Sequence, residues 1–170
     1  MTDFAALAAS DRAFGPEECA GLAARAAAAV CLDEHVHERD RQRLYELLWR
    51  DEHSEAWLLR WPEPRDTGFH DHDGSCGAIY VIDGRVTEEP LVMGRPTLVR
   101  EYGPGDTFEF NGGHIHRMHH DPGAVTIHVY SPPIRRLGVH EVTDGILTRK
   151  PQSADEETPE TPSVDAAMTG

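Results

Sequence analysis

The stretch Gly68-Phe69-His70-Asp71-His72-Asp73-Gly74-Ser75-Cys76-Gly77 places two histidines, two positions apart, in a turn-rich segment that leads into the apolar run 78–82. Alternate residues of an extended chain point to the same side, so His70 and His72 can reach one metal ion while Asp71 points away. Neutral imidazole binds Fe, Zn, Cu and Ni well, and a set of three histidines leaves coordination positions open for chemistry. Two exposed loop histidines would give the same local pattern, so the metal site needs a third ligand from elsewhere in the chain.

Composition limits the kinds of partner that this chain can bind. It has 170 residues, of which 39% are hydrophobic and 27% are charged, and this fits a single domain. The formal net charge of -14, from 30 acidic and 16 basic residues, argues against nucleic acid and anionic membranes, because both require a basic surface. No apolar segment is long enough to span a membrane, no export signal is visible, and three cysteines without scaffold spacing fit a reducing compartment. We therefore expect a cytoplasmic protein.

The two ends of the chain differ in amino-acid composition from its middle. Residues 1–32 are rich in alanine, and Pro16 followed by two glutamates predicts the start of a helix, with room for a second short helix before it. The apolar face of this helix predicts packing at a sheet edge or, alternatively, binding to a partner. Residues 149–170 are acidic and contain almost no large apolar side chain, which is typical of a disordered tail.

The middle segment, residues 33–148, predicts an all-β barrel or sandwich. After a charged connector at 33–43, short runs rich in β-forming residues alternate with turns of Gly, Pro, Asn and Asp. The expected strands are 44–50, 56–61, 78–82, 85–88, 97–102, 107–110, 125–131 and 139–147.

The third histidine of the metal site comes from a second conspicuous segment. His70-x-His72, followed by Gly77 and Gly84, has the spacing of the first motif of the cupin barrels, and Gly105-Asp106 with Asn111-x-Gly113-x-x-His116 resembles the second motif. Asn111 stands where proline is usual. The resemblance implies a small cupin (RmlC-like jelly-roll) barrel and selects His116 as the third ligand. His114, two positions earlier on the same face, remains an alternative.

The resemblance narrows further within the cupins. Many cupins have a glutamate ligand where this chain has Cys76-Gly77, so three neutral histidines remain. The strings His116-Arg117-Met118 and His128-Val129-Tyr130-Ser131-Pro132-Pro133 resemble the signature of the thiol dioxygenases, the family of cysteine dioxygenase type I. The similarity covers about residues 43–134. It implies Fe(II) held by His70, His72 and His116, and oxidation of a small thiol carboxylate, cysteine or a mercapto-acid, to its sulfinate with O2.

A second row of polar residues lies near the end of this similarity. Thr126, His128 and Tyr130 alternate along a strand and share one face, which could also be the wet face of an edge strand. The resemblance implies a catalytic row in which Tyr130 donates toward the substrate, His128 orients the phenol and Thr126 holds His128. Gly77 stands where animal members have a cysteine joined to this tyrosine, so we expect the bacterial type without a crosslink, and Cys76 as a small core residue.

The residue that binds the substrate carboxylate is open. Family members acting on cysteine use an arginine of the first barrel strand, and counting along 43–50 favours Arg43, then Arg50, with Arg60 on the next strand third. Two alternative functions also stay open: a three-His cupin with other metal chemistry (isomerase, hydrolase or ring-cleaving oxygenase), and a non-catalytic ligand-binding cupin. The expected partners are a small thiol and O2, without nucleic acid or membrane, in a monomer or weak homodimer.

Overall fold

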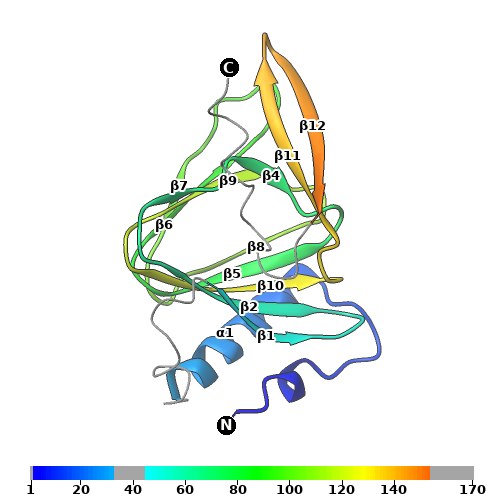
Figure 1. Ribbon diagram of the computed structural model, residues 1–170, viewed down its shortest axis with the longest axis vertical. Helices are drawn as coiled ribbons and strands as arrows, with labels where there is room; N and C mark the ends of the chain where they lie inside the picture. The colour runs from blue at the N-terminus through cyan, green and yellow to red at the C-terminus, as the bar shows by residue number, and fades with distance from the viewer. Residues whose placement is uncertain (1, 33–44, 154–170) are drawn as a thin grey trace.

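The fold is a barrel made of two antiparallel sheets that face each other, with one long helix outside it (Figure 1). The computed structural model describes residues 2–32 and 45–153. The elements in this part of the chain are η1 (Ala5–Ala8), α1 (Pro16–Leu32), β1 (Tyr45–Arg50), β2 (Glu55–Trp61), β3 (Arg65–Asp66), β4 (Phe69–Asp71), β5 (Cys76–Asp83), β6 (Val86–Pro90), β7 (Arg100–Tyr102), β8 (Thr107–Phe110), β9 (His116–His120), β10 (Ala124–Ser131), β11 (Arg136–Thr143) and β12 (Ile146–Ser153). The predicted all-β cupin barrel with an N-terminal helix is confirmed.

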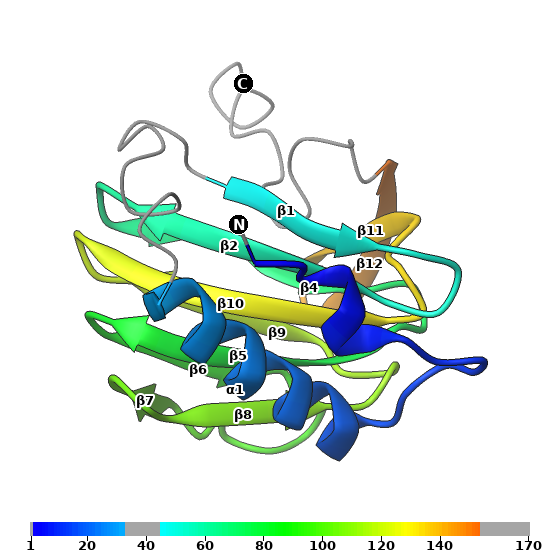
Figure 2. The same cartoon turned by 90° about the horizontal axis from the view of Figure 1, so that it is seen from below.

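Helix α1 covers the outer face of the five-stranded sheet, whose order is β1-β2-β10-β5-β8 (Figure 2). It begins at Pro16, as the sequence predicts, and buries Leu22, Ala26 and Val30 against Ile127 and Val129 of the sheet. The predicted position at a sheet edge is wrong. The outward side chains of the central strands are apolar, so the helix stabilises the fold most by covering them.

The inner face of the same sheet lines the barrel interior. Trp57, Ile79 and Tyr130 belong to a second buried cluster on this side. Strand β10 lies between β2 and β5, with Tyr130 paired to Glu55 on one side and to Gly77 on the other. Because successive residues of a strand point to opposite faces, β10 is buried on both sides, and its polar row faces inward.

The seven-stranded sheet forms the opposite wall, in the order β12-β11-β4-β9-β6-β7, with β3 paired to β9. In Figure 1 the described helices lie on the far side of the barrel from this sheet. The patterns of the sequence do not predict the short strands β3, β4 and β9. The antiparallel register of β4 and β9 sets His70 directly opposite His116.

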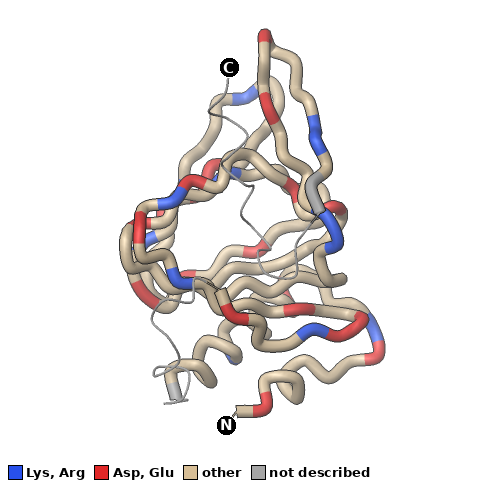
Figure 3. The backbone as a smooth tube through the Cα atoms, viewed as in Figure 1, with Lys and Arg blue, Asp and Glu red and all other residues tan. Residues whose placement is uncertain are grey.

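The C-terminal strands form a hairpin that rises above the barrel, with charges of both signs along it (Figure 3). The predicted single strand 139–147 is wrong. Asp144 and Gly145 have φ values of 52° and 77° and make a two-residue turn, for which Asp-Gly is a favoured pair. Strand β12 continues beyond residue 148, where the predicted tail begins.

Two further predictions concern membrane spans and the segments on either side of the barrel. No helix in that part of the chain is long and apolar enough to cross a membrane. The charged connector at 33–43 and the tail from residue 154 lie outside the described residues.

Candidate metal centre and active site

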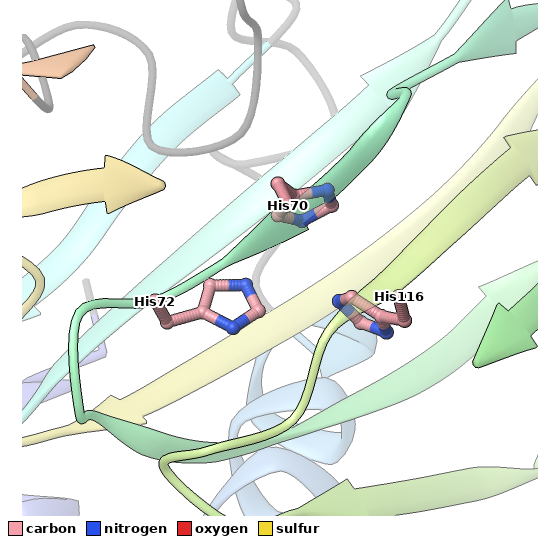
Figure 4. A group of neighbouring side chains, drawn as sticks. All are labelled: His70, His72 and His116. Carbon is pink, nitrogen blue, oxygen red and sulfur yellow. The ribbon is translucent and has the colours of Figure 1, made fainter. Parts of the chain in front are cut away.

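The three histidines of the predicted triad meet inside the barrel. His70 comes from β4, His72 from the loop that follows it, and His116 from the start of β9. Their rings point toward one another (Figure 4), and one nitrogen of each lies within 4.8 Å of the others. Each residue is at most 1% exposed. The structure thus brings together a buried cluster of three imidazole nitrogens.

Backbone and side-chain acceptors orient two of these rings. His70 Nδ1 lies 3.0 Å from the carbonyl oxygen of Gly68, and His116 Nδ1 lies 3.2 Å from Glu88 Oε1. Both acceptors lack a proton to donate, so each Nδ1 carries the hydrogen. The Nε2 atom of each ring is buried and is the nitrogen that would bind a metal ion.

The alternative ligand His114 does not join the triad. Its Nε2 lies 2.7 Å from Glu88 Oε1, and with Glu88 and His116 it forms a second group of possible ligand atoms that includes neither His70 nor His72. Burial tends to raise the pKa of Glu88, but hydrogen bonds from His114 and His116 outweigh it and lower that pKa to about 2. Glu88 is therefore a buried carboxylate beside the candidate metal ligands, and the sequence patterns did not single it out.

Asp71 points away from the triad, as strand alternation predicts, and ties the histidine loop to the C-terminal hairpin. Arg149 donates two hydrogen bonds to it, at 2.6 and 2.8 Å, and His140 Nε2 lies 2.6 Å from Oδ2. Burial acts to raise the pKa of Asp71, but these donors hold it well below its ordinary value. Neither His140 nor Arg149 carries a local sequence signal, because both contacts form only when distant strands pair.

The polar row of β10 forms a continuous chain of hydrogen bonds. Thr126 Oγ1 lies 2.8 Å from His128 Nε2, and His128 Nδ1 lies 3.0 Å from the Tyr130 hydroxyl. The indole of Trp61 donates to Thr126 Oγ1 at 3.2 Å. All three residues of the row are fully buried, and the Tyr130 ring lies 5.0 Å from the His72 ring. The row therefore ends beside the metal cluster.

Gly77 leaves room for this row. A Cβ placed on Gly77 would lie 2.5 Å from the Val129 carbonyl oxygen and 3.0 Å from the Tyr130 ring. A larger residue here would displace Tyr130. Cys76 points to the opposite face, where its sulfur lies 3.3 Å from the carbonyl oxygens of Phe14 and Ser131.

The candidate substrate arginines have different positions. Arg43 lies outside the described residues. Arg50 faces the interior side of β1, with its guanidinium 5.3 Å above the Trp57 ring and its Nε 2.7 Å from Glu55 Oε2. Arg60 alternates with Leu59 and Trp61, which belong to the interior cluster, so it points to the outer face.

A pocket opens beside Arg50. Its volume is about 420 Å³, and its lining includes Asp73 and Ser75, which follow His72, and Pro132 and Ile134, which follow Tyr130. The triad and the polar row themselves do not line this pocket, which is connected to them only through neighbouring residues of the chain.

The donor set fits a divalent transition metal. Three neutral imidazoles on one side of an ion leave further positions open, as in catalytic rather than structural sites. Imidazole suits iron, zinc, copper and nickel, so the chemistry of the ligands defines a class of metal.

Comparison with known proteins identifies the family. A family model described as cysteine dioxygenase type I matches residues 39–142, more than half of the chain. BH2720 from Bacillus halodurans is similar in structure at 17% identity with a TM-score of 0.51, over 74% of this chain and 86% of that one. An RmlC-like cupin from Shewanella frigidimarina NCIMB 400 is similar at 18% identity with a TM-score of 0.46, over 55% and 81%. The first likeness supports the fold, while the family match covers the triad and the polar row, and the chain belongs to the cysteine dioxygenase type I family.

Proposed function

We propose that this protein is an Fe(II)-dependent thiol dioxygenase that converts a small thiol carboxylate, cysteine or a mercapto-acid, to its sulfinate. The observation that carries the proposal is the buried three-histidine cluster beside the Thr126–His128–Tyr130 row, in a chain of this family. The reaction adds both atoms of O2 to the thiol sulfur, RSH + O2 → RSO2H, so it balances without a reductant. His70, His72 and His116 would hold the iron, which supplies O2 activation and thiolate binding when present.

The direction of hydrogen bonding along β10 favours a phenol that donates into the site. An indole N–H can only donate, so Trp61 occupies one lone pair of the Thr126 oxygen. The Thr126 hydroxyl can then donate to His128 Nε2, which leaves Nδ1–H to donate to the Tyr130 oxygen. The Tyr130 oxygen then accepts from His128, so the phenol O–H can donate to the reacting group, where a donor stabilises developing negative charge.

The carboxylate of the substrate would bind an arginine at the barrel mouth. Arg50 is the described candidate, because its guanidinium lies over the interior Trp57 ring and it lines a pocket with residues that follow His72 and Tyr130 in the chain. Its ion pair with the buried Glu55 holds the guanidinium in place, and Arg43 remains the other candidate. A small thiol and O2 are the partners that this site would take.

Oxygen uptake tests the proposal directly. The protein is loaded anaerobically with Fe(II) and mixed with cysteine, 3-mercaptopropionate or mercaptosuccinate. We expect one O2 consumed per sulfinate formed with at least one of these thiols. The Tyr130→Phe variant keeps the ring and should lose about 10²-fold to 10⁴-fold in rate while retaining the metal, because it removes only the donor. No stoichiometric uptake with any thiol by the iron-loaded protein would refute the proposal.

Two comparisons separate the remaining functions. His116→Ala should lose both metal and activity, whereas a non-catalytic binder would keep its ligand affinity. Metal analysis of the purified protein distinguishes iron from the zinc, nickel or manganese of other cupin chemistry.

The role of Arg50 can be tested separately. The Arg50→Gln variant should raise KM for carboxylate thiols and leave KM for cysteamine, which has no carboxylate, unchanged.

A further inference from the structure

A buried carboxylate lies directly behind one of the three metal-site histidines. Glu88 belongs to β6, which pairs with β9, and only 2% of its surface is exposed. A single oxygen, Oε1, accepts from His116 Nδ1 at 3.2 Å and from His114 Nε2 at 2.7 Å. The three candidate ligands are neutral imidazoles, but the Glu88 carboxylate contacts one of them, His116.

His116 and His70 differ in the group that accepts a hydrogen bond from Nδ1. His70 donates to the carbonyl oxygen of Gly68, which is a neutral acceptor. The carboxylate of Glu88 is a stronger acceptor, and its charge raises the electron density on the ring to which it is bonded. His116 is therefore held with its proton on Nδ1 and with an Nε2 that is a better metal ligand than an unassisted imidazole.

His114 holds Glu88 in turn. The His114 ring stands 4.9 Å from the His116 ring and offers the shorter hydrogen bond to the same oxygen. Two ring N–H groups thus meet at one oxygen of Glu88 and orient the buried carboxylate.

We propose that Glu88 is a positioning residue that locks the ring of His116 and supplies the negative charge that the three histidine ligands lack. The inference rests on the metal site of the proposed function, but not on its substrate or reaction. In this arrangement His114 is a donor that holds Glu88 and is not a metal ligand.

Metal titration tests this role without any turnover. Co(II) is added to the metal-free protein, and its visible absorption reports both affinity and ligand field. Glu88→Gln should weaken Co(II) binding about 10-fold to 100-fold, the usual effect of removing such a partner, and should shift the spectrum. Glu89→Gln is the matched control, since it removes the same charge from the adjacent position of β6, whose side chain faces Arg117 instead. It should bind Co(II) as the wild type does.

A third variant separates the two roles of His114. His114→Gln removes one donor to Glu88, so we expect a loss of Co(II) affinity smaller than that of Glu88→Gln. A loss as large as that of His116→Ala would place His114 in the ligand set and overturn the assignment. Equal affinity and an unchanged spectrum in Glu88→Gln would overturn it as well.

The wild type alone provides a check if Glu88→Gln does not fold. In the zinc-loaded protein, long-range ¹H–¹⁵N NMR spectra should show His116 protonated at Nδ1 and bound to metal through Nε2; the reverse assignment contradicts the proposal. A wild type that binds no Co(II) would instead refute the proposed function. A wild type that binds Co(II) but oxidises no thiol would refute only the thiol chemistry.

Discussion

The two sheets of the barrel both line its interior, yet different forces hold them in shape. The five-stranded sheet is buried on both faces, with α1 packed on one side and the interior cluster on the other. Its polar row, Thr126, His128 and Tyr130, extends inward from a strand whose other face carries Val125, Ile127 and Val129. Burial of apolar surface fixes the strand, and neutral hydrogen bonds within the row orient its side chains.

The seven-stranded sheet carries His70 and His116 of the candidate metal site, with His72 in the loop after β4, and buried carboxylates contact these elements. Asp71, behind the histidine loop, accepts hydrogen bonds from Arg149 and His140. Glu88, behind β9, accepts from His114 and His116. Among residues 2–32 and 45–153 no helix covers the outer face of this sheet (Figure 1), so hydrogen bonds to anions contribute more to orienting the candidate ligands there. The metal half of the site should therefore be more sensitive to charge than the polar row.

The largest effect on stability should come from the apolar sheet. Ile127→Ala removes a fully buried side chain under α1 and should lower the free energy of unfolding by about 2–5 kcal/mol. Chemical denaturation measures this loss. Because the candidate ligands lie on the other sheet and on the loop after its strand β4, Co(II) affinity below the unfolding transition should change by less than threefold. Ile146→Ala, at a position 65% exposed, is the control and should be near neutral. A parallel collapse of Co(II) affinity in Ile127→Ala would show that the two sheets are not separable in this way.

The reverse pattern is expected for Asp71→Asn. The variant keeps the shape of the side chain but removes the charge that Arg149 and His140 contact, so we expect a loss of about 1–3 kcal/mol in unfolding free energy. Co(II) affinity should also fall, because His70 and His72 flank this residue. Glu141→Gln removes an exposed ion pair with Lys150 in the same hairpin and should do neither. Unchanged metal affinity in Asp71→Asn would show that the contact with the C-terminal hairpin does not help to position His70 and His72.

Lowering the pH should reduce the stability that the ionised Asp71 carboxylate contributes. The folded pKa of this carboxyl lies below its ordinary value of 3.8, so its contribution is present above that pH and is lost as pH falls through the lower folded value. The stability difference between metal-free wild type and Asp71→Asn should therefore shrink steadily below about pH 4. Denaturation curves collected across this range test the sign. A difference that grows with acid would mean that Asp71 is not stabilised as an anion.

The smallest effect is expected at the outer surface of the seven-stranded sheet. Arg117 pairs with Asp66 there, where both side chains are more than a third exposed, and the pair lowers the pKa of Asp66 to about 2. Water and salt screen such a pair, so Asp66→Asn should cost only about 0.2–1 kcal/mol. The cost should decrease further in 1 M salt. An effect as large as that of Asp71→Asn would show that exposure does not separate the two kinds of anion in this sheet.

Several predictions from the sequence depended on strand alternation and motif spacing, which can be recognised without knowledge of the fold. The spacing of His70 and His72 and the inward row of β10 follow from strand alternation, and the cupin-like spacing pointed to His116. The same reasoning misread residues 139–147 as one strand, although Asp144-Gly145 is a strong turn signal. It also placed α1 at a sheet edge, because periodicity shows that a helix has an apolar face but not what covers it.

By itself the sequence indicated an all-β fold and the shared face of Thr126, His128 and Tyr130, because turn signals and strand alternation are local. The resemblance of its motifs to the cupins selected His70, His72 and His116 as candidate ligands. Only the tertiary structure decided which anions hold the triad. Glu88 is 28 residues from His116, and Asp71 is 78 residues from Arg149, so no local pattern relates them. These contacts depend on the register between strands, which is set by the burial of the whole sheet and not by neighbouring residues.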